Sequence, residues 1–399
     1  MTNVLPPADQ EQVISHQPCD EIDLILACVR ESIHTAHRGT IEDILRKELN
    51  WDSLYRQAEK FGLIPIVYFT LHKISPEQVP GPILCRMKEI YLGSMTRSMI
   101  QTRDLLQIIQ CCREHEIPVI PYKGVVLSQQ IYGDIGLRIS SDIDIIVRRQ
   151  DVVRTKALLL SQGYTTSLSL TPAQDEKFLK VHSEHHFGHS CKTMVDIHWQ
   201  FISGYYLDPF EEDRIWSGLK GVFLEGQDIA TLSTEMLIIS LCIHGAKHQW
   251  KNTDMICDLA GVIASGKDIN WELVFSTARE KRIERILFLG LWLAEVVMKT
   301  EFPQGVSDAI RRDRGMHHWI SSCIAAMFRE DPMPEDDIRF VMYWVSIREC
   351  IWDKLRVIAS LAFIPDHKDW AYISLPGILA PFYSVVRPIR LVFEYGVKG

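Results

Sequence analysis

Residues 137–147 read LRISSDIDIIV and place two acids, Asp142 and Asp144, at the start of an apolar run. The alternation predicts a β-strand, in which residues two apart point to the same face of a sheet. Asp142 and Asp144 then stand side by side, while Ile143 and Ile145 point toward a core. Adjacent carboxylates repel each other and are costly near an apolar layer unless a cation neutralises them. Because Mg²⁺ takes oxygen ligands and shares them with phosphates, the pattern favours metal-assisted phosphoryl or nucleotidyl transfer.

The composition bounds the class of protein. A chain of 399 residues is too long for a single ordinary hydrophobic core, so more than one domain is expected. A content of 47% hydrophobic and 24% charged residues is typical of a soluble globular protein. The net charge of -8 argues against broad binding to long nucleic acid. Ten cysteines without a C-x-x-C pair fit a reducing cytoplasm and give no support for a zinc ribbon. Without a signal-like start or a membrane-length apolar run, we expect a cytoplasmic protein with no membrane partner.

After a polar leader, the hydrophobic pattern changes from helical to mixed and back to helical, which predicts an α+β protein in four parts. These are a flexible leader over 1–19, an N-terminal helical domain over 20–115, a mixed block over 116–228 and a C-terminal helical domain over 229–399. We therefore expect a small mixed sheet flanked by N- and C-terminal helical domains.

Within the mixed block, short apolar runs and alternating runs predict strands, and 3.6-residue periodicity predicts helices. The predicted strands are 116–122, 142–147, 164–170, 184–189 and 193–201, and the predicted helices are 125–132 and 150–162, the second ended by Gly163.

Three further features complete a candidate site. Asp196 lies on an apolar strand, and His198 shares its face. A two-metal site for in-line displacement needs about three carboxylates, so Asp196 would join Asp142 and Asp144 if the strands are neighbours. Lys123-Gly124 stands where a strand meets a helix N-terminus, which is a ready anion site.

The order of these motifs resembles the nucleotidyltransferases of the DNA polymerase beta-like superfamily, and more narrowly its uncharacterised bacterial members. Lys123-Gly124, then Arg138 and Asp-Ile-Asp-Ile-Ile-Val, then Val-Asp-Ile-His-Trp at 195–199 carry this resemblance. It implies a polymerase beta-like sheet, Mg²⁺ (two ions) and a nucleoside triphosphate. By the resemblance, Asp142, Asp144 and Asp196 are the metal ligands, and Asp196 also helps to activate the acceptor hydroxyl. Most of the superfamily has Gly-Ser or Gly-Gly where this chain has Lys-Gly.

Other residues have open roles. Arg138 could contact the nucleotide or could clamp the acidic strand. Glu184, His186, His198 and His244 are candidate pocket residues. A zinc site is a rival reading of His244-x-x-x-His248, but Gly245 stands where H-E-x-x-H proteases have Glu.

The sequence thus predicts an enzyme that moves a nucleoside monophosphate from an NTP such as ATP to a hydroxyl or similar acceptor on a small molecule, peptide or protein, releasing pyrophosphate. The alternatives are a toxin-like transferase acting on RNA ends, a catalytically degenerate binding or regulatory member, and kinase-type transfer of the γ-phosphate.

Overall fold

The computed structural model describes residues 19–33, 37–168, 170–207, 209–266, 268–313, 315–328, 337–373, 375 and 377–395. The predicted leader therefore lies outside the described residues, apart from Cys19. The described chain is mostly helical, with one small mixed sheet and a separate hairpin, which confirms the α+β class.

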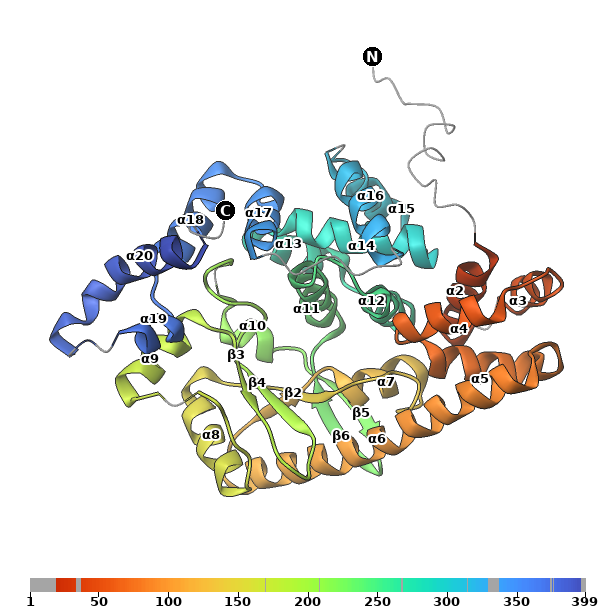
Figure 1. Ribbon diagram of the computed structural model, residues 1–399, viewed down its shortest axis with the longest axis horizontal. Helices are drawn as coiled ribbons and strands as arrows, with labels where there is room; N and C mark the ends of the chain where they lie inside the picture. The colour runs from red at the N-terminus through yellow and green to blue at the C-terminus, as the bar shows by residue number, and fades with distance from the viewer. Residues whose placement is uncertain are drawn as a thin grey trace, which may run out of the picture.

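Helices precede the sheet in the chain. They are α2 (Asp20–Ile33), α3 (Arg38–Leu45), α4 (Trp51–Lys60), α5 (Ile64–Ile74), the short η2 (Pro76–Gln78) and α6 (Gly81–Glu114). Helix α6 runs beneath the sheet, and α2, α3 and α4 lie to one side of it, next to α12 (Thr253–Ser265) (Figure 1). Asn50 begins α4 by accepting a hydrogen bond from the Ser53 amide. With 34 residues, α6 is about 50 Å long and runs beneath the whole sheet.

The sheet has the strand order β1-β2-β4-β3. Its strands are β1 (Val119–Pro121), β2 (Asp142–Val147), β3 (Glu184–Phe187) and β4 (Met194–His198). β2 pairs antiparallel with β1 and parallel with β4, and β3 pairs antiparallel with β4. Parallel neighbours need a long crossover, and here η3 (Arg149–Asp151), α8 (Val152–Ser161), α9 (Pro172–Val181) and β3 supply it.

Strand β2 is buried on both faces apart from its first residues. Ile143 and Ile145 belong to a core cluster that includes Leu105 and Ile108 of α6, while Ile146 belongs to the larger cluster on the opposite face. The acids at the front of β2 share the Ile146 face, so the alternation of the strand directs them away from α6.

The helix α7 (Gly124–Tyr132) begins directly against the start of β2. Gly124 has a φ of +56°, and a Cβ there would lie 3.3 Å from the carbonyl oxygen of Asp142. Glycine is therefore required at this position by the backbone conformation and by the close approach of the strand.

The strand predicted over 164–170 is wrong. In the described part of this range, 164–168 and 170, an isolated bridge between Thr165 and Gly188 is the only β-pairing. The Thr166 hydroxyl instead bonds the His185 ring at 2.9 Å and accepts the Leu168 amide at 3.2 Å. Side-chain hydrogen bonds of this kind compete with a strand ladder.

The sequence patterns missed the helices α9 and α10 (Glu212–Trp216) and the strands β5 (Lys220–Leu224) and β6 (Gln227–Thr231) of the mixed block. The helix α9 begins with a capping box between Thr171 and Gln174, and Pro172 occupies its first turn. The strands β5 and β6 form a hairpin through a tight turn in which Glu225 and Gly226 both have positive φ. The hairpin follows the short helix α10.

After β6, which extends past the predicted boundary at 228, the secondary structure of the described residues is helical. Its elements are α11 (Thr234–Lys247), α12 (Thr253–Ser265), α13 (Trp271–Glu280), α14 (Glu284–Met298), α15 (Gln304–Ile310), α16 (Met316–Met327), α17 (Asp337–Ile347), α18 (Ile351–Phe363), α19 (His367–Tyr372), η4 (Gly377–Phe382) and α20 (Tyr383–Tyr395). None of the helices within the described ranges is long and apolar enough to cross a bilayer.

One hydrophobic core joins helices that precede the sheet in the sequence to helices that follow it. Leu24 of α2, Leu259 of α12 and Leu289 of α14 are fully buried in one cluster, and α2 packs against both later helices. The division into domains at 115 and 228 stays a prediction.

Candidate active site

The sheet register brings the polar residues of three strands into two adjacent rows. Asp144 on β2 lies opposite Asp196 on β4, and His186 on β3 lies opposite Asp196 from the other side. In the next row, His198 on β4 lies opposite Glu184 on β3. All five side chains share one face because they are spaced by two residues on their strands.

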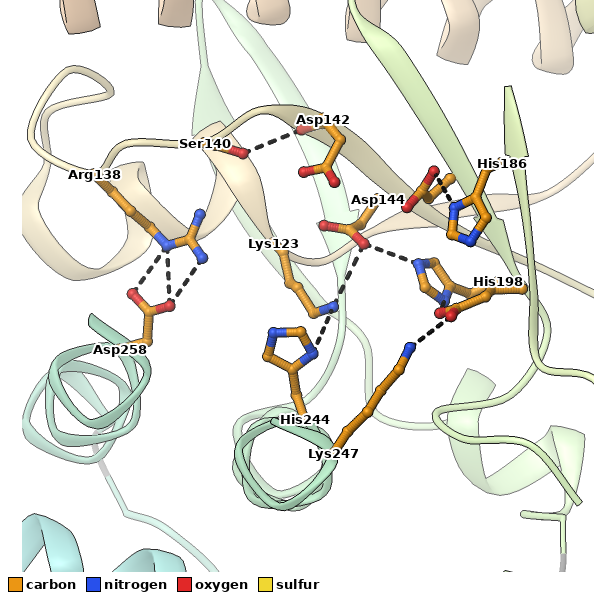
Figure 2. Close-up of polar contacts among 12 residues, drawn as sticks. Lys123, Arg138, Ser140, Asp142, Asp144, His186, His198, His244, Lys247 and Asp258 are labelled. Atoms are coloured by element: carbon orange, nitrogen blue, oxygen red, sulfur yellow. Dashed lines mark hydrogen bonds and ion pairs between the residues drawn. The ribbon is translucent and has the colours of Figure 1, made fainter. Parts of the chain in front are cut away.

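Asp144, Asp196 and His198 form a group that could hold a metal ion. One ligand atom from each lies within 4.8 Å of the others. The His198 Nε2 atom is 2.8 Å from Asp144 Oδ1, and His186 Nδ1 is 2.8 Å from Asp196 Oδ1 (Figure 2). Carboxylate oxygens with one imidazole nitrogen are a donor set that divalent cations accept.

Asp142 lies beside this group but is not part of it. Its carboxylate faces the same space as that of Asp144 (Figure 2). Burial raises the pKa of Asp142, and the nearby charges of Asp144 and Asp196 raise it further. The site thus concentrates negative charge that a bound cation would relieve.

Lys123 supplies the counter-charge in the site. Its Nζ atom is 3.4 Å from Asp144 Oδ1 and 3.5 Å from His244 Nδ1, and both the lysine and aspartate side chains are only 9% exposed. Burial alone would raise the pKa of Asp144, but Lys123 and His198 hold it well below its usual range. Asp144 is therefore a carboxylate at every pH at which the protein would work.

Helix α11 closes a ring of polar contacts over the sheet. Its Lys247 pairs with Glu184, whose Oε2 atom is 3.4 Å from His198 Nδ1, and its His244 contacts Lys123. Burial opposes ionisation of Glu184, but His198 and Lys247 lower its pKa to about 2. Since His198 and Lys123 meet at Asp144, the ring joins α11 to three strands and to the start of α7 (Figure 2).

His244 of α11 and His248, the residue that follows the helix, are uncharged neighbours. Their rings lie 4.7 Å apart. Burial lowers the pKa of His244 well below its usual range, and burial lowers that of His248 to about 4. Gly245 stands between them because the ring of Trp250 occupies the space that a side chain would take. Among the described residues, no metal-binding group includes either histidine.

Arg138 is held by an ion pair with α12. Its Nε atom lies 2.9 and 3.0 Å from the two carboxylate oxygens of Asp258, and its Nη2 atom lies 2.9 Å from Oδ2 (Figure 2). The side chains are 14% and 5% exposed. This geometry makes Arg138 a clamp between the segment before β2 and α12.

Asp258→Asn should therefore destabilise the fold by about 3 kcal/mol, because it leaves a buried guanidinium without its charge partner. Urea unfolding measures this change. The matched control is Asp43→Asn, since Asp43 and Arg46 form a pair in which both side chains are 72% exposed, and we expect a change below about 0.5 kcal/mol. Unchanged stability in Asp258→Asn together with lost nucleotide affinity would instead assign Arg138 to the nucleotide.

A pocket of about 370 Å³ opens over this face of the sheet. Every predicted site residue except Gly124 lines it. The sequence patterns missed Ser240, Lys247 and Asp254, which also line it, and named His248 only for the rival zinc site. Lys247 could have been found from its spacing, because it lies three residues after His244 and so shares a face of the same helix.

The profile of the uncharacterised nucleotidyltransferase family matches residues 47–299, which is well over half of the chain. The chain belongs to this family. The membership confirms the resemblance seen in the motifs and makes the protein a transferase of the nucleotidyltransferase class. The matched region contains the sheet, the polar ring and α11 to α14, so the family and the site coincide.

The likenesses to individual proteins are weak. Among solved structures, the chain is similar to the solution structure of the antibiotic-resistance factor ANT(2'')-Ia, with 13% identity and a TM-score of 0.33 over 46% of this chain and 93% of that chain. No curated protein sequence matches.

Proposed function

We propose that the protein is a magnesium-dependent nucleotidyltransferase that moves a nucleoside monophosphate from an NTP to a hydroxyl acceptor. One observation carries the proposal. Asp144 and Asp196 lie opposite each other on neighbouring parallel strands, and Lys123 at the start of α7 faces the same pocket. Paired carboxylates beside a lysine and a helix N-terminus suit a metal-bound triphosphate.

The residues present fit the metal. Asp144 and Asp196 would hold Mg²⁺, with Asp142 as a further oxygen ligand and His198 orienting Asp144 through its 2.8 Å contact. When bound, Mg²⁺ neutralises phosphate charge and polarises the phosphorus that is attacked. Two ions are our proposal from the number of acids.

The side chains of the protein position the reactants. Lys123 receives the β- and γ-phosphates, aided by the free N–H groups at the start of α7, including that of Gly124. The acceptor oxygen forms a bond to the α-phosphorus, and the bond from that phosphorus to the α,β-bridging oxygen breaks. Pyrophosphate leaves with the electron pair, and Asp196 takes the proton of the acceptor hydroxyl.

The direct test incubates the purified chain with Mg²⁺, one α-labelled NTP at a time and a set of small-molecule, peptide and protein acceptors. We expect labelled acceptor and pyrophosphate. Release of nucleoside diphosphate would show kinase-type transfer of the γ-phosphate. Magnesium and nucleotide binding without any transfer would identify a binding or regulatory member and contradict the proposal.

Action on RNA ends is less well supported. It needs a basic face, and the basic residues near the C-terminus do not supply one. Arg387 and Arg390 are buried and both pair with Asp369, while Lys398 lies outside the described residues. The acceptor is therefore better sought among small molecules, peptides and proteins.

A further inference from the structure

The site pocket is one of three cavities that meet in a row. A second cavity of about 100 Å³ shares Arg138, Ile139 and Asp254 with the site pocket. A third cavity of about 280 Å³ shares Gly62 and Ile139 with the second. Ile139 lines all three, so the cavities adjoin one another from the acidic strands to the gap between α6 and the turn before α5, and the second and third together are called the groove.

The volume of the site pocket leaves the acceptor outside it. Sites for molecules of drug size occupy about 300–1,000 Å³, so a pocket of about 370 Å³ holds one nucleotide and little more. An acceptor that reaches the α-phosphorus must therefore enter from an adjoining space. The second and third cavities are such a space, and they open on the side of the pocket where Arg138 and Asp254 stand.

The charge of the groove indicates what it binds. The acids Glu59, Glu89, Asp254 and Asp258 line the second and third cavities, against Arg97 and Arg138. Arg138 is fully engaged by Asp258. Asp254 stands at the junction with the site pocket, and no ion pair within 4 Å is formed by it in the part of the chain that the structure describes. Burial and the charge of Asp258 raise the pKa of Asp254 to about 6, so a cationic partner there would be stabilised.

The geometry points to this groove as the acceptor site, and to an elongated acceptor that carries a protonated amine beside Asp254. The inference rests on the proposed function, which it deepens by naming the class of acceptor. The amine is recognised at Asp254 while a hydroxyl of the same molecule reaches the phosphorus. Arg138 holds the wall between the two spaces and touches neither reactant in this arrangement.

The probe for the test is the linear tetra-amine spermine, compared with uncharged tetraethylene glycol and the dicarboxylate azelate. Titration calorimetry in 150 mM salt suppresses diffuse attraction between exposed charges. We expect spermine to bind with one-to-one stoichiometry and the other two probes not to bind. Asp254→Asn should weaken spermine binding about tenfold. Equal spermine affinity in the wild-type protein and Asp254→Asn, or a preference for azelate, would overturn the inference.

A steric variant tests the groove without touching a charge. Gly93 lines the third cavity on α6, and a Cβ added there would have no heavy atom within 4 Å. Gly93→Trp therefore attaches without a clash at the Cβ and places its ring in the cavity, and replacing a helical glycine also favours the helix. Gly81→Trp is the control, because Gly81 lies on the same helix, also faces open space and lines none of the three cavities. We expect Gly93→Trp alone to weaken spermine binding at least tenfold, and equal binding in the two variants would count against the groove.

Binding of the Mg²⁺ complex of ATP to the same proteins separates the two proposals. If that complex binds the wild-type chain and spermine does not, the acceptor inference fails and the proposed function stands. If the complex itself fails to bind, the proposed function fails first.

Discussion

Asp144→Asn should lower nucleotidyl transfer by about three orders of magnitude while the chain stays folded. The carboxylate is the point at which β2, β4 and Lys123 meet, and an amide is a poor ligand for Mg²⁺. Loss of about 4 kcal/mol of transition-state stabilisation corresponds to this factor. The fold should survive with a lower thermal midpoint, because the Asn carbonyl still accepts hydrogen bonds from His198 and Lys123 while the buried Lys123 loses its charge partner.

Initial rates with labelled NTP, together with thermal melting, measure both halves of this expectation. Asp196→Asn should show a loss of similar size, since Asp196 faces Asp144 across the strand pair. The matched control is Asp228→Asn, because Asp228 also lies on a strand but outside the pocket. Near-wild-type turnover in Asp144→Asn would remove the metal-assisted mechanism.

The local part of the site could be predicted because its residues lie two positions apart on the same strand. The alternation in β2 places Asp142 and Asp144 on one face, and the structure has this strand at 142–147, as the sequence indicated. The alternation in β4 likewise puts Asp196 and His198 together. Such patterns follow from the two-residue period of a strand, which needs no knowledge of the remaining chain.

The partners of these residues could not be predicted, because they depend on long-range packing. Lys247 meets Glu184 across 63 residues, and Arg138 meets Asp258 across 120. No local period links such positions, so the sequence left Arg138 undecided between nucleotide and clamp. The predicted strand at 164–170 failed for the related reason that a strand needs a neighbour, and there only Thr165 and Gly188 bond each other.

Lys123→Met should change the two ligands of the site in opposite directions. The Lys123 ammonium lies 3.4 Å from Asp144 Oδ1, and both side chains are buried. It therefore competes with a metal ion for the Asp144 carboxylate. Two unit charges about 4 Å apart at an effective dielectric constant of about 20 interact by about 4 kcal/mol. Removing the lysine should tighten the binding of Mg²⁺ alone by about tenfold, which needs a gain of about 1.4 kcal/mol, roughly a third of this energy.

The same variant should weaken the binding of the nucleotide by about 30-fold, since the phosphates lose the buried ammonium group of Lys123. Without metal, Asp144 would lose Lys123 and keep His198 as a partner, so the thermal midpoint should fall and then recover as MgCl₂ is added. Titration calorimetry with MgCl₂, and then with Mg²⁺ and a non-hydrolysable ATP analogue, measures the two affinities, with the exposed Lys88→Met as the control. A fall in both affinities would mean that Lys123 only supports the fold of the pocket, because a lysine that competes with the cation and then turns to the phosphates must give opposite signs.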